Sequence, residues 1–130
     1  MQARGLILRT RSIEADMTQD DQWPIWQGNM AAQCLAQPDD ALAIIDLTSD
    51  TRRDVTYGAL HQMADGLARA LLAEVQPGDR VGVLLSQSPW CAAAHLAIWK
   101  VGAISVPLFK LFKHDALASR IGDAGCAIVL

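Results

Sequence analysis

Three polar residues, Ser86, Gln87 and Ser88, occupy the place in this sequence best suited to bind an anion. They follow the apolar run 81–85 and precede Pro89, which opens a helical pattern. The first N–H groups of a helix have no partner within the helix, so an anion or a side-chain hydroxyl can accept hydrogen bonds from them. We weigh two roles here: capping of the helix by Ser88, which we favour because proline suits the first helical position, and contact with a ligand.

Histidines are the second set of residues with chemical potential. His95 lies within an apolar helical run, four residues before Trp99, and no nucleophile or second metal ligand is spaced to work with it. We expect a core histidine whose ring has a hydrogen-bond partner. His61 and His114 are expected on the surface. The sequence therefore predicts no catalytic, cofactor-binding or metal-binding residue.

The three cysteines argue against a metal or redox site. Cys34, Cys91 and Cys126 are far apart and form no C-x-x-C pair, the spacing on which many zinc and dithiol sites depend. Cys91 and Cys126 lie in apolar runs and are predicted to pack as small hydrophobic residues. Unpaired cysteines in odd number fit a reducing compartment, so we expect a cytoplasmic protein.

Composition and charge exclude several classes of protein. The 130 residues are 52% hydrophobic and 19% charged, a balance typical of one globular domain. The net charge is −3 without a long run of one sign, so nucleic acid is not an expected partner. The longest apolar stretch, 89–99, is much shorter than the roughly 20 residues of a membrane span.

The N-terminal part reads differently from the rest. Residues 1–22 mix arginines and leucines with several acids; targeting sequences are poor in acids, so we predict a loosely ordered extension, with a targeting sequence as the alternative. Residues 23–37 predict a short helix. Its predicted inner side consists of Trp26, Met30, Cys34 and Leu35, and Trp23 and Trp26 are predicted to anchor the segment on the core.

The remaining pattern predicts an α/β fold in which a helix and a β-hairpin precede two parallel βαβ units. A strand at 41–47 and an extended stretch at 54–56, joined by turn residues, predict the hairpin. Apolar residues at helical spacing follow Thr56, a suitable N-cap. The parallel units are predicted from strands near 81–85, 103–107 and 126–130, with helices at 89–101 and 114–124 between them.

Single residues support these boundaries. Gly102 follows the helix 89–101 and is predicted to adopt the left-handed conformation that ends a helix. Pro107 lies at the end of its strand, where a missing hydrogen bond matters least. The predicted buried stripe of the last helix consists of Leu117, Ile121 and Ala124. Because the strands end on Ser86-Gln87 and Pro107-Leu108 rather than on acids, a flavodoxin-like regulator is disfavoured.

Two stretches resemble motifs of the AMP-forming acyl-CoA synthetases and their adenylation-domain relatives. Residues 55–60, VTYGAL, are similar to the family's Leu/Val-Thr-Tyr-x-Glu-Leu motif, and residues 99–108, WKVGAISVPL, to its Lys-x-Gly-Ala-x-x-Val-Pro-Leu motif. The resemblance covers about residues 23–130 and is closest to acetyl-CoA or medium-chain acyl-CoA synthetases. Ala59 and Trp90 depart from it, because the family usually or often has glutamate at these two positions.

The resemblance implies a partial copy of the large N-terminal domain of an enzyme that activates a carboxylate with Mg-ATP and transfers the acyl group to CoA. The family's phosphate loop ending in Pro-Lys-Gly and its late catalytic lysine do not occur in this sequence. We therefore expect residues 23–130 to be a scaffold piece, inactive on its own, that holds no ATP, Mg or CoA. Lys110 and Lys113 are expected in a solvated loop, or alternatively at the rim of the enzyme's acyl or CoA channel.

The alternative function is a non-enzymatic, truncated α/β module. The sequence stops within the apolar strand 126–130, and an unpaired strand tends to associate. In that case we expect a homodimer, or a protein partner bound through exposed apolar surface.

Overall fold

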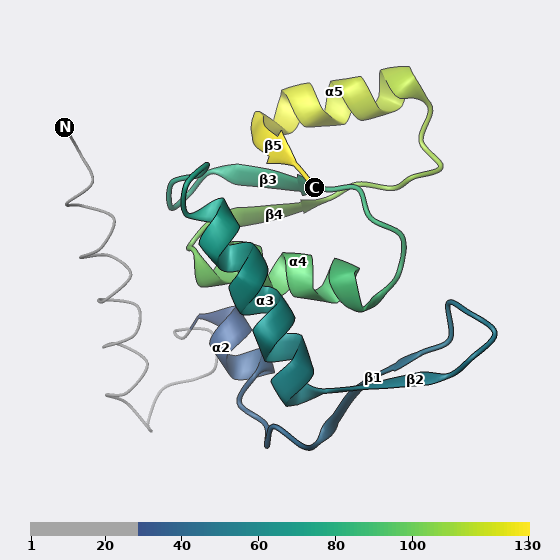
Figure 1. Ribbon diagram of the computed structural model, residues 1–130. Helices are drawn as coiled ribbons and strands as arrows, with labels where there is room; N and C mark the ends of the chain where they lie inside the picture. Colours follow the sequence, from purple (N-terminus) through teal and green to yellow (C-terminus); the bar gives the residue numbers. More distant parts are fainter. Residues whose placement is uncertain (1–28) are drawn as a thin grey trace.

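The structure, a computed structural model, describes residues 29–130 (Figure 1). The predicted extension 1–22 and the predicted anchors Trp23 and Trp26 lie outside the described residues. The helices and strands, in chain order, are α2 (Met30–Cys34), β1 (Leu42–Asp46), β2 (Arg53–Thr56), α3 (Tyr57–Leu71), β3 (Arg80–Val83), α4 (Pro89–Lys100), β4 (Ile104–Pro107), α5 (His114–Ala124) and β5 (Cys126–Val129).

A three-stranded parallel sheet in the order β4-β3-β5 forms the centre of the molecule. β3 pairs with β4 without interruption, and with β5 across a register shift between Arg80 and Val81. The predicted α/β fold with two parallel βαβ units is therefore confirmed. β1 and β2 form a separate antiparallel pair, which confirms the predicted hairpin.

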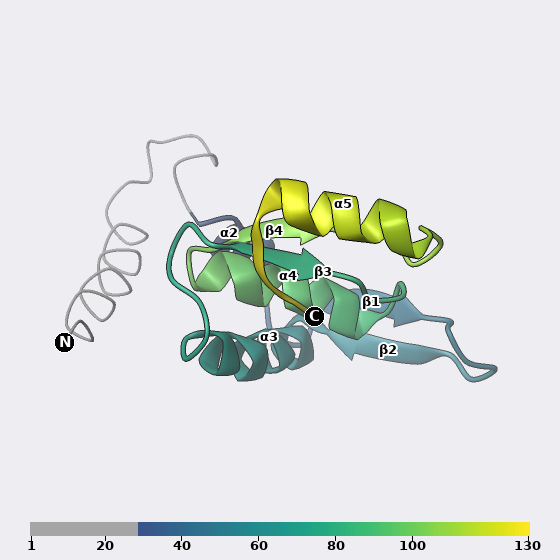
Figure 2. The same cartoon turned by 90° about the horizontal axis from the view of Figure 1, so that it is seen from above.

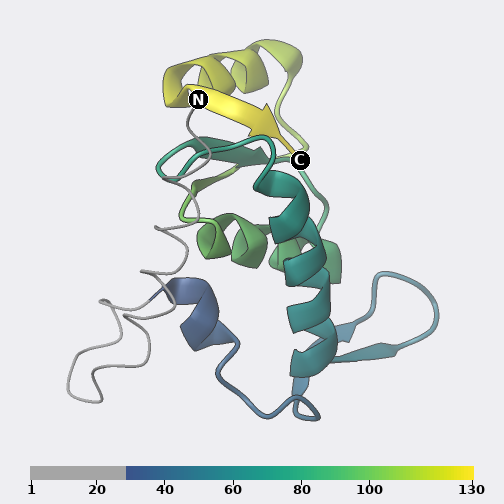
Figure 3. The same ribbon diagram turned by 60° about the vertical axis from the view of Figure 1, so that its left-hand side comes forward.

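Helices lie on both faces of the parallel sheet. α3 and α4 lie on one face and α5 on the other (Figures 1 and 3), while the hairpin extends beyond the sheet (Figure 2). The main core lies on the α3–α4 side, where Val81 of β3 and Ile98 of α4 are fully buried. All three residues 81–83 are buried, as expected for a strand covered on both faces.

A second buried cluster joins α2 to the rest. It consists of Ala31, Leu35, Leu60, Ala64, Ala93 and Leu96. Asn29 fixes the start of α2: its Oδ1 accepts a hydrogen bond from Ala31 N at 2.9 Å, and its Nδ2 donates to Trp99 O at 2.7 Å. The beginning of α2 is therefore bonded to the last turn of α4.

Both ends of α4 follow the predicted chemistry. Ser88 Oγ accepts a hydrogen bond from Cys91 N at 3.3 Å, and Pro89 occupies the first turn. At the other end Gly102 has φ 75°, its N–H donates to Trp99 O, and Ala103 N donates to Ile98 O, both at 3.0 Å. These two bonds form a Schellman motif, which lets the chain turn directly into β4.

The predicted inner side of the first helix is confirmed for Leu35 and wrong for Met30 and Cys34. Met30 is 55% exposed and Cys34 is also exposed, whereas Ala31 and Leu35 are buried. Within each pair the residues are four positions apart and share one helix face. The two pairs are offset by one position, so they lie on different faces of the helix. The cap at Asn29 and the bond to Trp99 select the second face, a contact between distant residues that periodicity does not reveal.

The residues of the predicted buried stripe of the last helix are less buried than predicted. α5 has the predicted bounds but no buried residue, and Leu117, Ile121 and Ala124 are only partly covered. The strands beneath it have four residues each, too little surface to enclose a helix of eleven. Cys126 is half-buried, less than predicted, while Cys91 is buried as predicted.

Candidate functional site

The polar segment 86–88 lies at the C-terminal edge of the parallel sheet, where α/β proteins bind their ligands. Ser88 caps α4 and donates its own hydroxyl hydrogen to Ser86 O at 3.2 Å. Ser86 Oγ accepts a hydrogen bond from Lys110 Nζ at 3.0 Å, so the loops after β3 and β4 meet here. The favoured capping role of Ser88 is confirmed, and the two hydroxyls bond within the segment and to Lys110.

A groove of about 530 Å³ lies beside this edge, between β1 and the first turns of α4. Its size is in the range of small-molecule sites. The lining residues are Ile44, Ile45, Asp46, Leu47, Thr48, Gln87, Ser88, Pro89, Cys91, Ala92 and His95. The walls are mainly apolar, with a carboxylate, an imidazole and hydroxyls among them.

Asp46 is the one buried charged residue among residues 29–130. Its Oδ1 accepts hydrogen bonds from Thr48 N at 2.9 Å and Thr48 Oγ1 at 2.6 Å, and its Oδ2 accepts from Arg53 Nη2 at 2.5 Å. The bonds from Thr48, followed by Arg53, lower the pKa of Asp46. Asp46 is thus an ionised anchor of the hairpin. Sequence reasoning assigned it no role, although the Asp-x-Thr pattern at a strand end is a signal for a side-chain turn.

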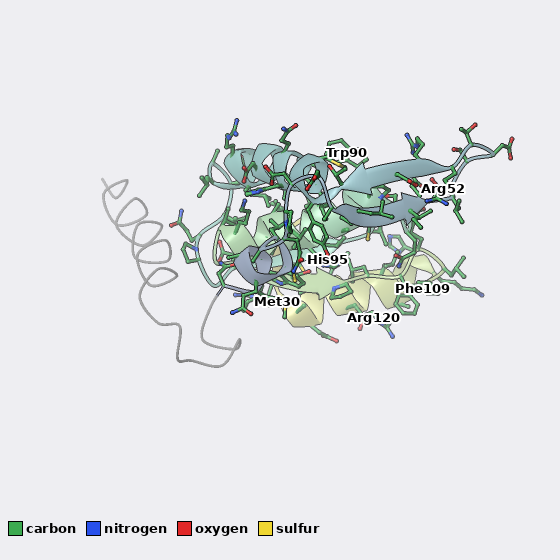
Figure 4. All side chains as sticks on the ribbon, turned by 90° about the horizontal axis from the view of Figure 1, so that it is seen from below. Met30, Arg52, Trp90, His95, Phe109 and Arg120 are labelled. Atoms are coloured by element: carbon green, nitrogen blue, oxygen red, sulfur yellow. The ribbon has the colours of Figure 1, made fainter. Side chains whose placement is uncertain are left out.

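His95 extends from α4 toward β4. Its Nδ1 lies 2.5 Å from Ser105 Oγ, and its ring is 6.0 Å from that of Trp99. Figure 4 shows His95 between α2 and the hairpin. Partial burial lowers the pKa of His95, so the ring is neutral at pH 7 and suited to this bond. His95 has a hydrogen-bond partner, as expected, and that partner is Ser105. The ring is half-buried, however, and is not part of the closed core.

The other two histidines occupy the surface positions predicted for them. His61 Nε2 lies 3.6 Å from Asp65 Oδ2, and Asp65 Oδ1 also pairs with Lys100 Nζ, which links α3 to α4. Burial is the largest single influence on Asp65 and opposes its charge. The hydrogen bond and charge of Lys100, together with the charges of His61 and Arg69, outweigh burial, so the pKa of Asp65 falls. His114 is exposed, 3.4 Å from Asp115.

The described residues offer little for metal or redox chemistry. Within residues 29–130 no three potential metal ligands gather in one place, and the three cysteines are free. No helix in this part of the chain is both long and apolar enough to cross a bilayer. The arrangement chiefly positions loops at one edge of a sheet.

Comparison with known proteins places the whole described region in one group. The sequence model of a family described as AMP-binding enzyme matches residues 30–130. The acetyl-coenzyme A synthetase of Novosphingobium aromaticivorans is 40% identical over 110 residues, which cover 78% of this chain and 17% of that protein. The chain thus spans about a sixth of the length of this curated relative.

Solved structures agree with the sequence comparison. The acyl-CoA synthetase of Brucella canis superposes with a TM-score of 0.74 at 27% identity, covering 83% of this chain and 23% of that one. The N-terminal subdomain of NpsA from Klebsiella oxytoca gives a TM-score of 0.62 at 26% identity, covering 77% and 24%. The structure that matches is the N-terminal subdomain of that protein, which is the region that the resemblance implies for this chain.

Proposed function

The chain belongs to the AMP-binding enzyme family, and from that premise we propose that it is the N-terminal scaffold portion of an ATP-dependent, AMP-forming acyl-CoA synthetase. The observation that carries this proposal is the 40% identity to an acetyl-coenzyme A synthetase over 110 residues. The reaction of the whole protein joins a carboxylate to AMP with release of pyrophosphate, and the CoA thiol then displaces AMP. Acetate or a medium-chain acid is the proposed substrate, and the cytoplasm the proposed location.

We further propose that residues 23–130 are inactive on their own. Activation of a carboxylate needs donors around the triphosphate and a metal ion to offset charge. The family's phosphate loop ending in Pro-Lys-Gly and its late catalytic lysine do not occur in this sequence. The Ser86 hydroxyl already accepts a hydrogen bond from Lys110, and the Ser88 hydroxyl already caps the start of α4. The role of this part is to hold the loops after β3 and β4 in a fixed relation.

Two measurements test this function. The 130-residue chain, mixed with ATP, Mg²⁺, CoA and acetate or a medium-chain acid, is expected to release no pyrophosphate above background; turnover would overturn the claim of inactivity. Replacing the aligned segment of the Novosphingobium aromaticivorans relative by residues 30–130 is expected to give an active chimera. A folded but inactive chimera would contradict the scaffold role.

A non-enzymatic module that dimerises is the second candidate. It rests on the exposed large hydrophobic residues, among them Ile104 at 51% and Val129 at 40% exposure, which lie on the two edge strands of the sheet. Sedimentation of the chain distinguishes the two. A discrete, soluble dimer favours the module, and a monomer or an aggregate favours the portion of a larger enzyme.

A further inference from the structure

The connection between β4 and α5 is a tight turn with an apolar tip. Phe112 N donates a hydrogen bond to Phe109 O at 3.0 Å, which closes the turn 109–112. Leu111, at the tip, is 80% exposed, more than any other large hydrophobic side chain within residues 29–130, and Phe109 is 57% exposed. We call residues 109–112 the aromatic turn.

Several side-chain contacts support the aromatic turn. The rings of Phe109 and Phe112 meet edge to face with their centres 5.6 Å apart, and the guanidinium of Arg120 lies 4.0 Å from the centre of the Phe112 ring. Lys110, next to the tip, is bonded to Ser86. Figure 4 shows Phe109 and Arg120 beside α5. Leu111 is therefore exposed at the tip of a turn that its neighbours support through defined contacts.

Positive charge surrounds this apolar tip. Lys110, Lys113 and Arg120 carry three permanent positive charges, and one acid, Asp115, lies near them at the start of α5. The chain as a whole has a net charge of −3. The aromatic turn is thus a locally basic surface on an acidic protein, and its charge complements an anionic surface.

We propose that the aromatic turn docks on an anionic lipid surface, with Leu111 and Phe109 entering the interface and the three cations contacting headgroups. Apolar side chains flanked by lysine and arginine bind membranes in this way, since the apolar tips leave water while the charges stay at the headgroups. The small size of the turn favours lipid over protein. Its four residues are far fewer than the roughly 20–30 residues that each partner contributes to a stable protein interface, whereas lipid headgroups rearrange around a small apolar tip.

Vesicle flotation with the full 130-residue chain tests the proposal. We expect binding to phosphatidylcholine vesicles that contain phosphatidylglycerol, and weaker binding at about 1 M than at about 0.1 M salt, because the Debye length falls from about 10 to about 3 Å. Leu111→Glu, which removes an apolar tip and adds a negative charge, is expected to weaken binding about tenfold or more. Leu111→Trp is expected to strengthen it, since tryptophan favours the interface.

Leu47→Glu is the matched control, because Leu47 is 71% exposed and lies in the β1–β2 connection, a different segment from the aromatic turn. It is expected to bind vesicles as the unchanged chain does, and circular dichroism checks that each variant folds. Equal binding to neutral and anionic vesicles, or an equal loss with Leu47→Glu, would overturn the proposal. So would full binding by Leu111→Glu, which would mean that the cations alone hold an anion. The assay contains no ATP or CoA, so its outcome is independent of the proposed enzymatic function.

Discussion

Gly82 provides a sharp test of how the sheet is packed. It lies in the middle of β3, and a Cβ atom at this position would lie 3.0 Å from Leu108 Cδ1 and 3.0 Å from Val129 Cγ2. Carbon atoms in contact are normally about 3.5–4.0 Å apart. Leu108 is only 7% exposed, and the branched side chain of Val129 has few rotamers, so neither neighbour moves away freely. We expect Gly82→Ala to lower the free energy of unfolding by about 1–3 kcal/mol, the usual cost of overpacking.

The chain contains its own control for this change. Gly66 lies within α3, and a Cβ atom there would have no heavy atom within 4 Å. Alanine is preferred over glycine inside helices by about 1 kcal/mol, so Gly66→Ala is expected to stabilise the protein by about 0.5–1 kcal/mol. The same chemical change should therefore have opposite signs at the two positions.

Urea unfolding, followed by circular dichroism and tryptophan fluorescence, measures both effects. The midpoint of Gly82→Ala should fall and that of Gly66→Ala should rise, with the slope unchanged. Shortening the neighbour in the double variant Gly82→Ala, Leu108→Ala should cost less than the two single changes added together. A Gly82→Ala protein as stable as the unchanged chain, with the same slope, would refute the packing argument.

Three further outcomes are expected. Asn29→Ala removes the cap of α2 and the bond to Trp99 and should cost about 1–2 kcal/mol by urea unfolding; no loss would mean that α2 does not depend on this bond. Burial lowers the pKa of His95 from its ordinary value of 6.5, so the unfolded chain binds more protons than the folded chain as the pH falls. The free energy of unfolding should therefore be highest above pH 6.5 and decrease below it. This decline should be smaller in His95→Gln, as unfolding at several pH values will show. A thiol reagent should modify the exposed Cys34 at once and the buried Cys91 only at the rate of unfolding; rapid modification of both would contradict the packing of α4.

Local rules predicted the elements well. Thr56 and Ser88 cap their helices, and Gly102 has the positive φ expected of it, because each depends on neighbours within a few residues. The succession of strands and helices along the chain follows from the alternation of apolar runs and helical stripes. These features require no knowledge of what lies on the other side of the sheet.

Features that depend on distant residues were not predicted. Arg80 donates hydrogen bonds to Ala124 O at 3.0 Å and to Gly125 O at 2.9 Å, which holds the end of α5 against β3 across more than forty positions of sequence. The partner of His95 is Ser105, ten residues away on a strand whose register decides the contact. Of the candidate site, the sequence predicted the segment 86–88 but not the groove, because the hairpin that forms one wall precedes the other by about forty residues.

The Schellman motif at Gly102 makes one part of the chain intolerant of insertions. Only Ala103 separates this glycine from β4, so an added residue there would turn every β4 side chain to the opposite face of the sheet. Ser105 would turn away from His95, and Ile104 would take its place against α4. The β1–β2 connection, residues 47–52, has no such coupling. Length changes among homologues should therefore accumulate in that connection and be absent between α4 and β4.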